Sequence, residues 1–200
     1  MNRRLFLNYG SKLTLVSLAA FNFGCSIQPR IENAKTALIY GTRYGATKDT
    51  AEWIIAGADK KIDLLNIETL NFEESLKNYD KFIIGSGIWI DGPHKRLIEM
   101  LDTHKEAMQE RIIAAFIICG TTGEDEAGRK RIEGYFKRFY TPLDVKPPMQ
   151  AYFGGRMTIE KLSKTDRKLL DHFYNNVLKK PFISWDRTEP EEAKRFGAKV

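Results

Sequence analysis

The stretch Ala37–Ile54, with the sequence A-L-I-Y-G-T-R-Y-G-A-T-K-D-T-A-E-W-I, decides the fold of this chain. Its apolar run ends at Tyr40, and a short apolar run closed by turn residues is typical of a buried strand. A polar, glycine-containing turn follows over Gly41–Thr47, and the next residues are compatible with a helix over about Thr47–Ala58. The sequence therefore predicts a strand, a tight turn and a helix N-terminus in direct succession.

This succession predicts an anion site in the turn. The first N–H groups of a helix have no partner within the helix, and the helix dipole places partial positive charge there. The hydroxyl groups of Thr42 and Thr47 can each donate to a phosphate oxygen. Gly45 permits a close backbone approach or a positive φ. The alternative is an ordinary strand-to-helix turn in which a threonine serves as N-cap.

Two common nucleotide loops are absent from the turn. A nucleoside-triphosphate loop ends in Gly-Lys-Ser/Thr, and the turn has no such lysine. The dinucleotide motif G-x-G-x-x-G is also missing. A single terminal phosphate, held by hydroxyl groups and backbone amides, is the remaining match.

The turn resembles the phosphate loop of flavodoxins. The resemblance implies that the chain binds flavin mononucleotide (FMN) and that Thr42, Arg43, Tyr44, Gly45, Ala46 and Thr47 hold its phosphate. It rests on residues that fill the family's pattern at fixed spacing: Leu38, Ile39, Tyr40, Thr42, Gly45, Thr47, Ala51 and Ile54.

Strands and helices are predicted to alternate along the rest of the chain. This alternation implies a parallel sheet covered on both faces. The resemblance implies an α/β, flavodoxin-like three-layer sandwich with five parallel strands in the order 2-1-3-4-5 and FMN at the switch between strands one and three. The expected strands are Ala37–Gly41, Lys61–Ile67, Lys81–Ser86, Arg111–Cys119 and Gln150–Phe153. Beyond the first helix, others are expected over 71–78, from Pro93 to about Ala107, from Glu124 to Arg138, and after a Ser163–Asp166 capping box. A wide stripe on the last helix is expected to face the core, with Leu169, Phe173 and Val177 beside Leu170, Tyr174 and Leu178.

In that topology three loops meet over the carboxyl ends of strands one, three and four, namely Gly41–Thr47, Ser86–Gly92 and Cys119–Gly123. The resemblance implies that the second loop contacts the flavin ring through backbone amides and that Trp89 stacks on it, since both are large flat aromatic surfaces. The alternative for Trp89 is packing in the core or at an interface. The ring-binding residues expected from the second and third loops are Ser86, Gly87, Ile88, Trp89, Gly120, Thr121 and Thr122.

No catalytic residue or metal site is assigned. His94 lies near the expected site and acts either on a proton there or as a solvated residue at a helix start. Cys119 is interpreted as a buried small apolar residue or as a thiol near the flavin edge. Two cysteines, Cys25 and Cys119, form neither a disulfide framework nor a zinc site, and no His, Asp or Cys cluster has metal spacing.

Residues 1–25 have the layout of an export signal, with a basic start, the apolar stretch Leu13–Phe23 and small residues before Cys25. Arg3–Leu7 (R-R-L-F-L) resembles a twin-arginine signal, and Asn22–Cys25 partly resembles a lipoprotein cleavage box. We expect an export signal over 1–25, a linker over 26–35 and a flavodoxin-like domain over 36–200. The protein would then be periplasmic or a membrane-anchored lipoprotein; the alternative is an amphipathic N-terminal helix of a cytoplasmic protein.

Charge narrows the class of partner. The net charge is +6, and the first 24 residues carry three cations, Arg3, Arg4 and Lys12, and no acid, so the rest of the chain carries +3. The remainder is mildly basic, whereas flavodoxins that carry electrons are generally acidic, so anionic partners or membrane surfaces are favoured. The basic segments carry no nucleic-acid motif, and we interpret them as solvated helix faces.

Three functions remain open. The first is an exported FMN-dependent oxidoreductase that exchanges electrons with a quinone or a redox protein. The second is a non-enzymatic electron carrier. The third is oxidation of protoporphyrinogen. Residues 36–200 also resemble the flavodoxin-domain group that includes menaquinone-dependent protoporphyrinogen oxidase. This resemblance rests on Gly85–His94 (G-S-G-I-W-I-D-G-P-H), Phe153-Gly154-Gly155 and Trp185-Asp186. The sequence leaves the oligomeric state open.

Overall fold

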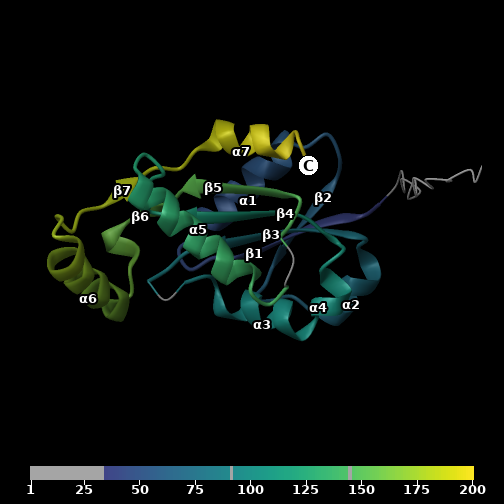
Figure 1. Cartoon of the computed structure of the whole chain (residues 1–200), viewed down its shortest axis with the longest axis horizontal. Helices are drawn as coiled ribbons and strands as arrows, with labels where there is room; N and C mark the ends of the chain where they lie inside the picture. The colour runs from purple at the N-terminus through teal and green to yellow at the C-terminus, as the bar shows by residue number, and fades with distance from the viewer. Residues whose placement is uncertain (1–33, 91, 144–145) are drawn as a thin grey trace, which may run out of the picture. The chain divides into compact units, whose positions relative to one another are not determined.

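The structure is a computed structural model that describes residues 34–90, 92–143 and 146–200, within the unit Asn33–Val200 (Figure 1). The expected signal over 1–25, with Cys25, and all of the linker except residues 34–35 lie outside the described residues.

Parallel strands form the central sheet. They are β1 (Thr36–Gly41), β2 (Ile62–Asn66), β3 (Lys81–Gly87), β4 (Ile112–Cys119) and β5 (Met149–Gly154). Their order is β2-β1-β3-β4-β5, and every neighbouring pair is parallel. The predicted fold class and strand order are therefore confirmed. The carboxyl ends of β1, β3 and β4 meet at one edge of the sheet, which positions the loops that follow them.

Helices cover both faces of the sheet. They are α1 (Ala46–Gly57), α2 (Phe72–Asn78), α3 (Lys95–Thr103), α4 (Lys105–Met108), α5 (Glu126–Tyr140), α6 (Lys164–His172) and α7 (Pro190–Gly197). Side chains alternate along each strand, so Leu38 packs with α1 and α7, whereas Ile39 packs with α3, α4 and α5. In Figure 1, α7 lies above the sheet and α3 below it.

The helix expected from Pro93 to Ala107 is wrong in two respects. It begins at Lys95, and it ends at Thr103 before a second short helix, α4. His104 leaves the helical conformation, with φ −115° and ψ 26°, and its ring centroid lies 4.5 Å from that of Phe72. The change of direction therefore places an aromatic ring against α2.

The segment 155–189, which we call the cap, separates β5 from α7. It contains the antiparallel pair β6 (Arg156–Met157) and β7 (Trp185–Asp186), the helical turn η1 (Ile159–Lys161), α6 and the helical segment η2 (Phe173–Leu178). Figure 1 shows α6 beyond the carboxyl edge of the sheet. The core-facing stripe expected on this helix is therefore found only in part, because Leu170 is 6% exposed whereas Leu169 and Val177 are 47% and 62% exposed.

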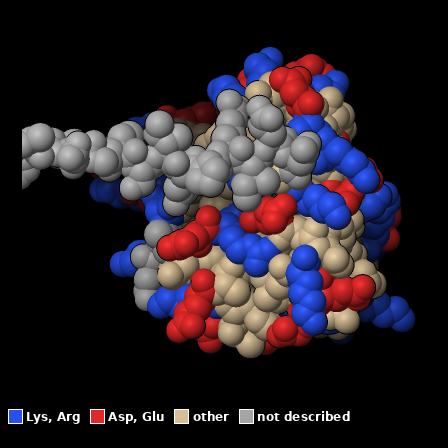
Figure 2. Space-filling model, turned by 90° about the vertical axis from the view of Figure 1, so that its right-hand side faces the viewer, with Lys and Arg blue, Asp and Glu red and all other residues tan. Residues whose placement is uncertain are grey.

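The surface at the end of the domain away from α6 is mixed in charge. Figure 2 shows Lys and Arg side chains there intermingled with Asp and Glu side chains. Within the described ranges, no helix combines the length and the apolar character needed to cross a membrane.

Candidate functional site

A cavity of about 1150 Å³ lies at the carboxyl edge of the sheet. The three loops predicted to meet there do line it together, and the cap, the start of α3 and the first half of α5 contribute most of the remaining wall. Gly45 and Ser86 are the predicted site residues that do not line the cavity. Those that do are Thr42, Arg43, Tyr44, Ala46, Thr47, Gly87, Ile88, Trp89, Gly120, Thr121 and Thr122.

The turn between β1 and α1 presents free donors. Gly45 is the N-cap of α1 with φ 92°, which is the positive φ that glycine accommodates. The hydroxyl oxygen of Thr42 accepts the Gly45 N–H at 3.0 Å, which leaves the hydroxyl proton free to donate. Helix α1 has no side-chain cap, so the alternative of a threonine N-cap is wrong.

Thr47 is the second donor of this turn. It is only 2% exposed, it lines the cavity, and its hydroxyl makes no hydrogen bond to the described part of the chain. A Cβ at Gly87 would lie 2.9 Å from the Thr47 hydroxyl oxygen, so the glycine leaves room for this side chain. The N–H groups of residues 46–48 lack intrahelical partners, as helix geometry requires. The turn therefore fits a phosphate group, and we call Gly41–Thr47 the phosphate turn.

The second loop holds Trp89 against the cavity. The guanidinium of Arg43 lies 4.6 Å from the centroid of the indole, and the Tyr44 ring lies 5.7 Å away in a tilted arrangement. Within the described residues, the indole N–H of Trp89 is buried without a partner. A buried donor in a cavity wall is a group that a ligand oxygen or nitrogen could satisfy.

Two backbone amides expected to face the ring are already paired. The Ile88 N–H donates to the Ile118 carbonyl at 2.7 Å, and the Trp89 N–H donates to the Gly92 carbonyl at 2.9 Å. The first bond joins the loop to β4, and the second joins two residues of the loop. These two amides are therefore already paired within the protein, whereas the indole N–H of Trp89 has no partner among the described residues. The expectation that backbone amides of this loop contact the ring stays a prediction.

Ser86 does not line the cavity but holds the second loop through its hydrogen bonds. It is fully buried, and its hydroxyl accepts the His94 N–H at 2.8 Å and donates to the Gly87 carbonyl at 3.0 Å. The His94 side chain lines the cavity with Glu68, and its Nε2 lies 3.0 Å from a Glu68 carboxylate oxygen. The other ring nitrogen, Nδ1, is buried without a partner among the described residues.

The third loop connects to the cap. The Gly120 carbonyl accepts a hydrogen bond from Arg187 at 3.1 Å. Cys119, at the end of β4, is 4% exposed, and its thiol lies 3.4 Å from the Thr121 carbonyl. Burial raises the pKa of the Cys119 thiol, so it stays protonated at neutral pH. Its burial agrees with the interpretation of Cys119 as a buried small apolar residue, and because it lines the cavity, a thiol near the flavin edge stays an alternative.

Asp166 of α6 ties the cap to the phosphate turn. It is 3% exposed, and its carboxylate accepts Arg43 Nη2 at 2.6 Å and the Tyr44 hydroxyl. The predicted capping box is confirmed in one half, since the Ser163 hydroxyl accepts the Asp166 N–H at 3.1 Å. The other half is wrong, because the Ser163 N–H donates to the Tyr44 hydroxyl oxygen instead of to Asp166.

Arg156 and Asp166 contact the phosphate turn, and the sequence motifs assigned neither of them to the site. Arg156 forms an ion pair with Asp49 in the first turn of α1 and lies beside the phosphate turn. A usable signal existed for Arg156, because it follows the Gly154-Gly155 turn directly and so had to emerge at the carboxyl edge of β5. No local signal linked Asp166 to Arg43, because the two are 123 residues apart.

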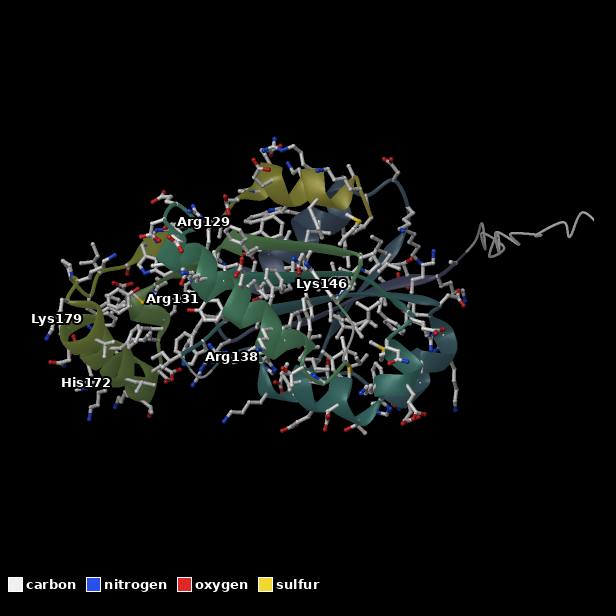
Figure 3. The ribbon with its side chains drawn as sticks, in the orientation of Figure 1. Arg129, Arg131, Arg138, Lys146, His172 and Lys179 are labelled. Carbon is white, nitrogen blue, oxygen red and sulfur yellow. The ribbon has the colours of Figure 1, made fainter. Side chains whose placement is uncertain are left out.

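Positive charge prevails in the cavity wall. The acidic residues that line it are Glu68 and Asp125. The basic residues that line it are Arg43, Lys95, Arg131, Arg156, Lys161, Lys180 and Arg187. Figure 3 shows Arg131 on α5 with Arg138 further along the same helix. In the parts of the chain that the structure describes, no group of three His, Cys, Asp or Glu side chains could hold a metal ion.

Comparison with known proteins gives a family. Residues 37–182 match the model of a family described as the flavodoxin domain. A search of curated proteins found no match.

Several solved structures are similar. A flavodoxin, WrbA-like protein from Agrobacterium tumefaciens is 18% identical with a TM-score of 0.44, covering 84% of this chain and 94% of that one. A flavoprotein in complex with FMN from Lactobacillus acidophilus is 19% identical with a TM-score of 0.42, and the similarity covers 60% of this chain and 93% of that one. Identities this low carry no functional information, so the family rests on the match over 37–182.

Proposed function

Because this chain belongs to the flavodoxin-domain family, we propose that it binds FMN in the cavity at the carboxyl edge of the sheet and transfers electrons through it. The observation that carries this proposal is the turn at Gly41–Thr47, where free hydroxyl and N–H donors face a cavity. No lysine or metal ion is needed there, since helix N-terminal amides and hydroxyl groups can bind a phosphate directly.

The chain's own residues would bind and orient the cofactor. Thr42, Thr47 and the first amides of α1 would hold the phosphate. Trp89 and the loop Gly120–Thr122 would border the ring, and the cap would exclude water from it. When bound, FMN supplies the one- and two-electron redox chemistry, while the protein sets the environment of the ring.

Removal of both threonine hydroxyls tests the cofactor site. We expect Thr42→Ala with Thr47→Ala to weaken FMN binding by roughly tenfold to a hundredfold, because each hydroxyl donates to a charged acceptor. Affinity can be measured by the quenching of FMN fluorescence, and bound flavin by its visible absorption. Thr103→Ala is a matched control, because its hydroxyl donates to the Glu99 carbonyl on α3, outside the cavity.

The outcomes separate cleanly. The wild-type protein and the Thr103→Ala variant should bind FMN with equal affinity. If the wild-type protein shows no flavin absorption after incubation with FMN, the proposal fails.

We also propose that the protein is exported and that its partner is a quinone or a redox protein. The export proposal is supported by the signal-like residues 1–25. Replacement of Arg3 and Arg4 by Lys should retain the protein inside the cell, and unchanged secretion would contradict it. The quinone proposal is supported by apolar side chains that the cap adds to the cavity wall, among them Leu162, Leu170 and Phe173.

Protoporphyrinogen oxidation is the alternative. It is favoured by the size of the cavity and by its combination of aromatic and basic lining residues, such as Trp89, Trp185 and Arg131. Failure of the FMN-loaded protein to oxidise protoporphyrinogen in the presence of a menaquinone analogue would remove this alternative.

A further inference from the structure

A cation from the cap lies at the phosphate turn. Arg156 is the first residue of β6, where it pairs with Asp186 of β7. Arg187, the residue that follows β7, donates its backbone N–H to the Gly155 carbonyl at 2.9 Å. These bonds fix the backbone of Arg156 at the carboxyl edge of the sheet.

The Arg156 side chain points at the start of α1. Its guanidinium forms an ion pair with Asp49, and both side chains are about three-quarters buried, with 27% and 28% exposed. Guanidinium Nη2 lies 3.7 Å from the position that a Cβ would take at Gly45. Arg156 lines the same cavity as Thr42 and Thr47, so a phosphate in the turn would lie within its field.

The charge balance of the turn favours a cation beside the phosphate. A phosphomonoester carries a charge of about −1.5 to −2 at pH 7. The helix dipole offers only about half a positive charge, and Asp49 adds a negative charge in the first turn of α1. A guanidinium has several N–H donors, so Arg156 can neutralise Asp49 and still donate to a phosphate oxygen.

The neighbouring cations are engaged elsewhere. Lys48 pairs with Glu52 at 2.8 Å, and Arg43 pairs with Asp166 while lying over Trp89. Lys161 and Lys180 line the cavity from exposed positions of the cap.

We propose that Arg156 is a specificity-determining residue, which makes the site select the phosphorylated flavin over riboflavin. This inference rests on the proposed function. It also gives the cap a role, because the cap supplies the cation that lies beside the phosphate turn.

The test compares two flavins that differ only by the phosphate. Dissociation constants for FMN and riboflavin are measured by fluorescence quenching for the wild-type protein and for Arg156→Gln. We expect FMN affinity to fall by about tenfold or more, because a charge-assisted hydrogen bond is lost, and riboflavin affinity to change by less than about twofold. Arg167→Gln, which removes an exposed cap cation that does not line the cavity, should leave both affinities within about twofold of the wild type.

Two further variants separate phosphate recognition from folding of the cap. Arg156→Lys keeps the charge and should retain part of the preference for FMN. Asp49→Asn with Arg156→Gln should bind FMN more tightly than Arg156→Gln alone, since no uncompensated carboxylate remains beside the phosphate. Equal losses for FMN and riboflavin, or an unchanged ratio of the two, would overturn the inference while leaving the proposed function standing. Absence of binding of either flavin by the wild-type protein would overturn both.

Discussion

Gly57 has no room for a side chain at the end of α1. A Cβ there would lie 2.1 Å from the Lys194 carbonyl oxygen, which is backbone of α7. We therefore expect Gly57→Ala to separate α1 from α7 and to lower the free energy of unfolding by about 1–3 kcal/mol, the usual cost of overpacking. Equilibrium unfolding in urea measures this change.

Gly134 provides the matched control at the residue scale. It lies inside α5, and a Cβ there would meet no atom within 4 Å. Gly134→Ala should therefore raise the free energy of unfolding by up to about 1 kcal/mol, because alanine is the better helix former. Equal stability of the two variants would show that α7 does not pack on α1 as closely as described.

At the scale of elements, the buried carboxylate of Asp166 is one of the groups that hold the cap to the phosphate turn, beside the Arg156–Asp49 ion pair. The Asp166 carboxylate accepts hydrogen bonds from Arg43 and Tyr44, and both of these side chains also contact Trp89. We expect Asp166→Asn to weaken this link by about 1–3 kcal/mol, because the asparagine keeps the shape but loses the charge. Amide hydrogen exchange should then accelerate by about tenfold or more in the cap, while β3 and β4 keep their protection.

Asp171→Asn is the control for that experiment. Asp171 lies on the same segment but is exposed, and its carboxylate accepts a hydrogen bond from Asn175 at 3.0 Å. Exchange in the cap should match the wild type in this variant. Similar exchange rates in the Asp166 and Asp171 variants would mean that the cap is held by its other contacts.

At the scale of the whole molecule, charge is distributed unevenly. The net charge is +6, basic residues prevail around the cavity, and the end away from α6 is mixed. We expect the reduced, FMN-loaded protein to pass electrons to ferricyanide at a rate that falls several-fold on raising salt from 10 mM to 300 mM, since screening weakens attraction for an anion. A neutral, water-soluble menaquinone analogue should react at a rate independent of salt, as stopped-flow absorption can show.

Two double variants, each of which removes two positive charges, test which part of the surface attracts the anionic acceptor. Arg131→Gln with Arg138→Gln removes cations from α5, where Arg131 lines the cavity and Arg138 Nη1 lies 3.6 Å from the Cβ position of Gly92. Lys77→Gln with Lys81→Gln removes the same charge from α2 and the start of β3. The first variant should slow the reaction with ferricyanide more than the second. No reaction with the quinone analogue would contradict the proposed quinone partner.

Most of the fold could be predicted from local patterns. The apolar runs of β1, β3 and β4 and the alternation of strands with helices fixed the sheet, and the spacing of Thr42, Gly45 and Thr47 located the phosphate turn. The FMN predicted from that spacing is supported by membership of the flavodoxin-domain family. The cap could not be predicted as a cap, because an amphipathic helix shows an apolar face without showing what that face will meet.

The sequence by itself determined where the strands and helices form and where the turn Gly41–Thr47 lies, because each depends on residues that are neighbours along the chain; the strand order followed from the family that this turn resembles. Tertiary structure alone decided which charges meet at that turn. Asp166 reaches Arg43 across 123 residues, and Arg156 reaches Asp49 only because β6 returns to the carboxyl edge of the sheet. Such pairings depend on distances in space, which no spacing along the chain records.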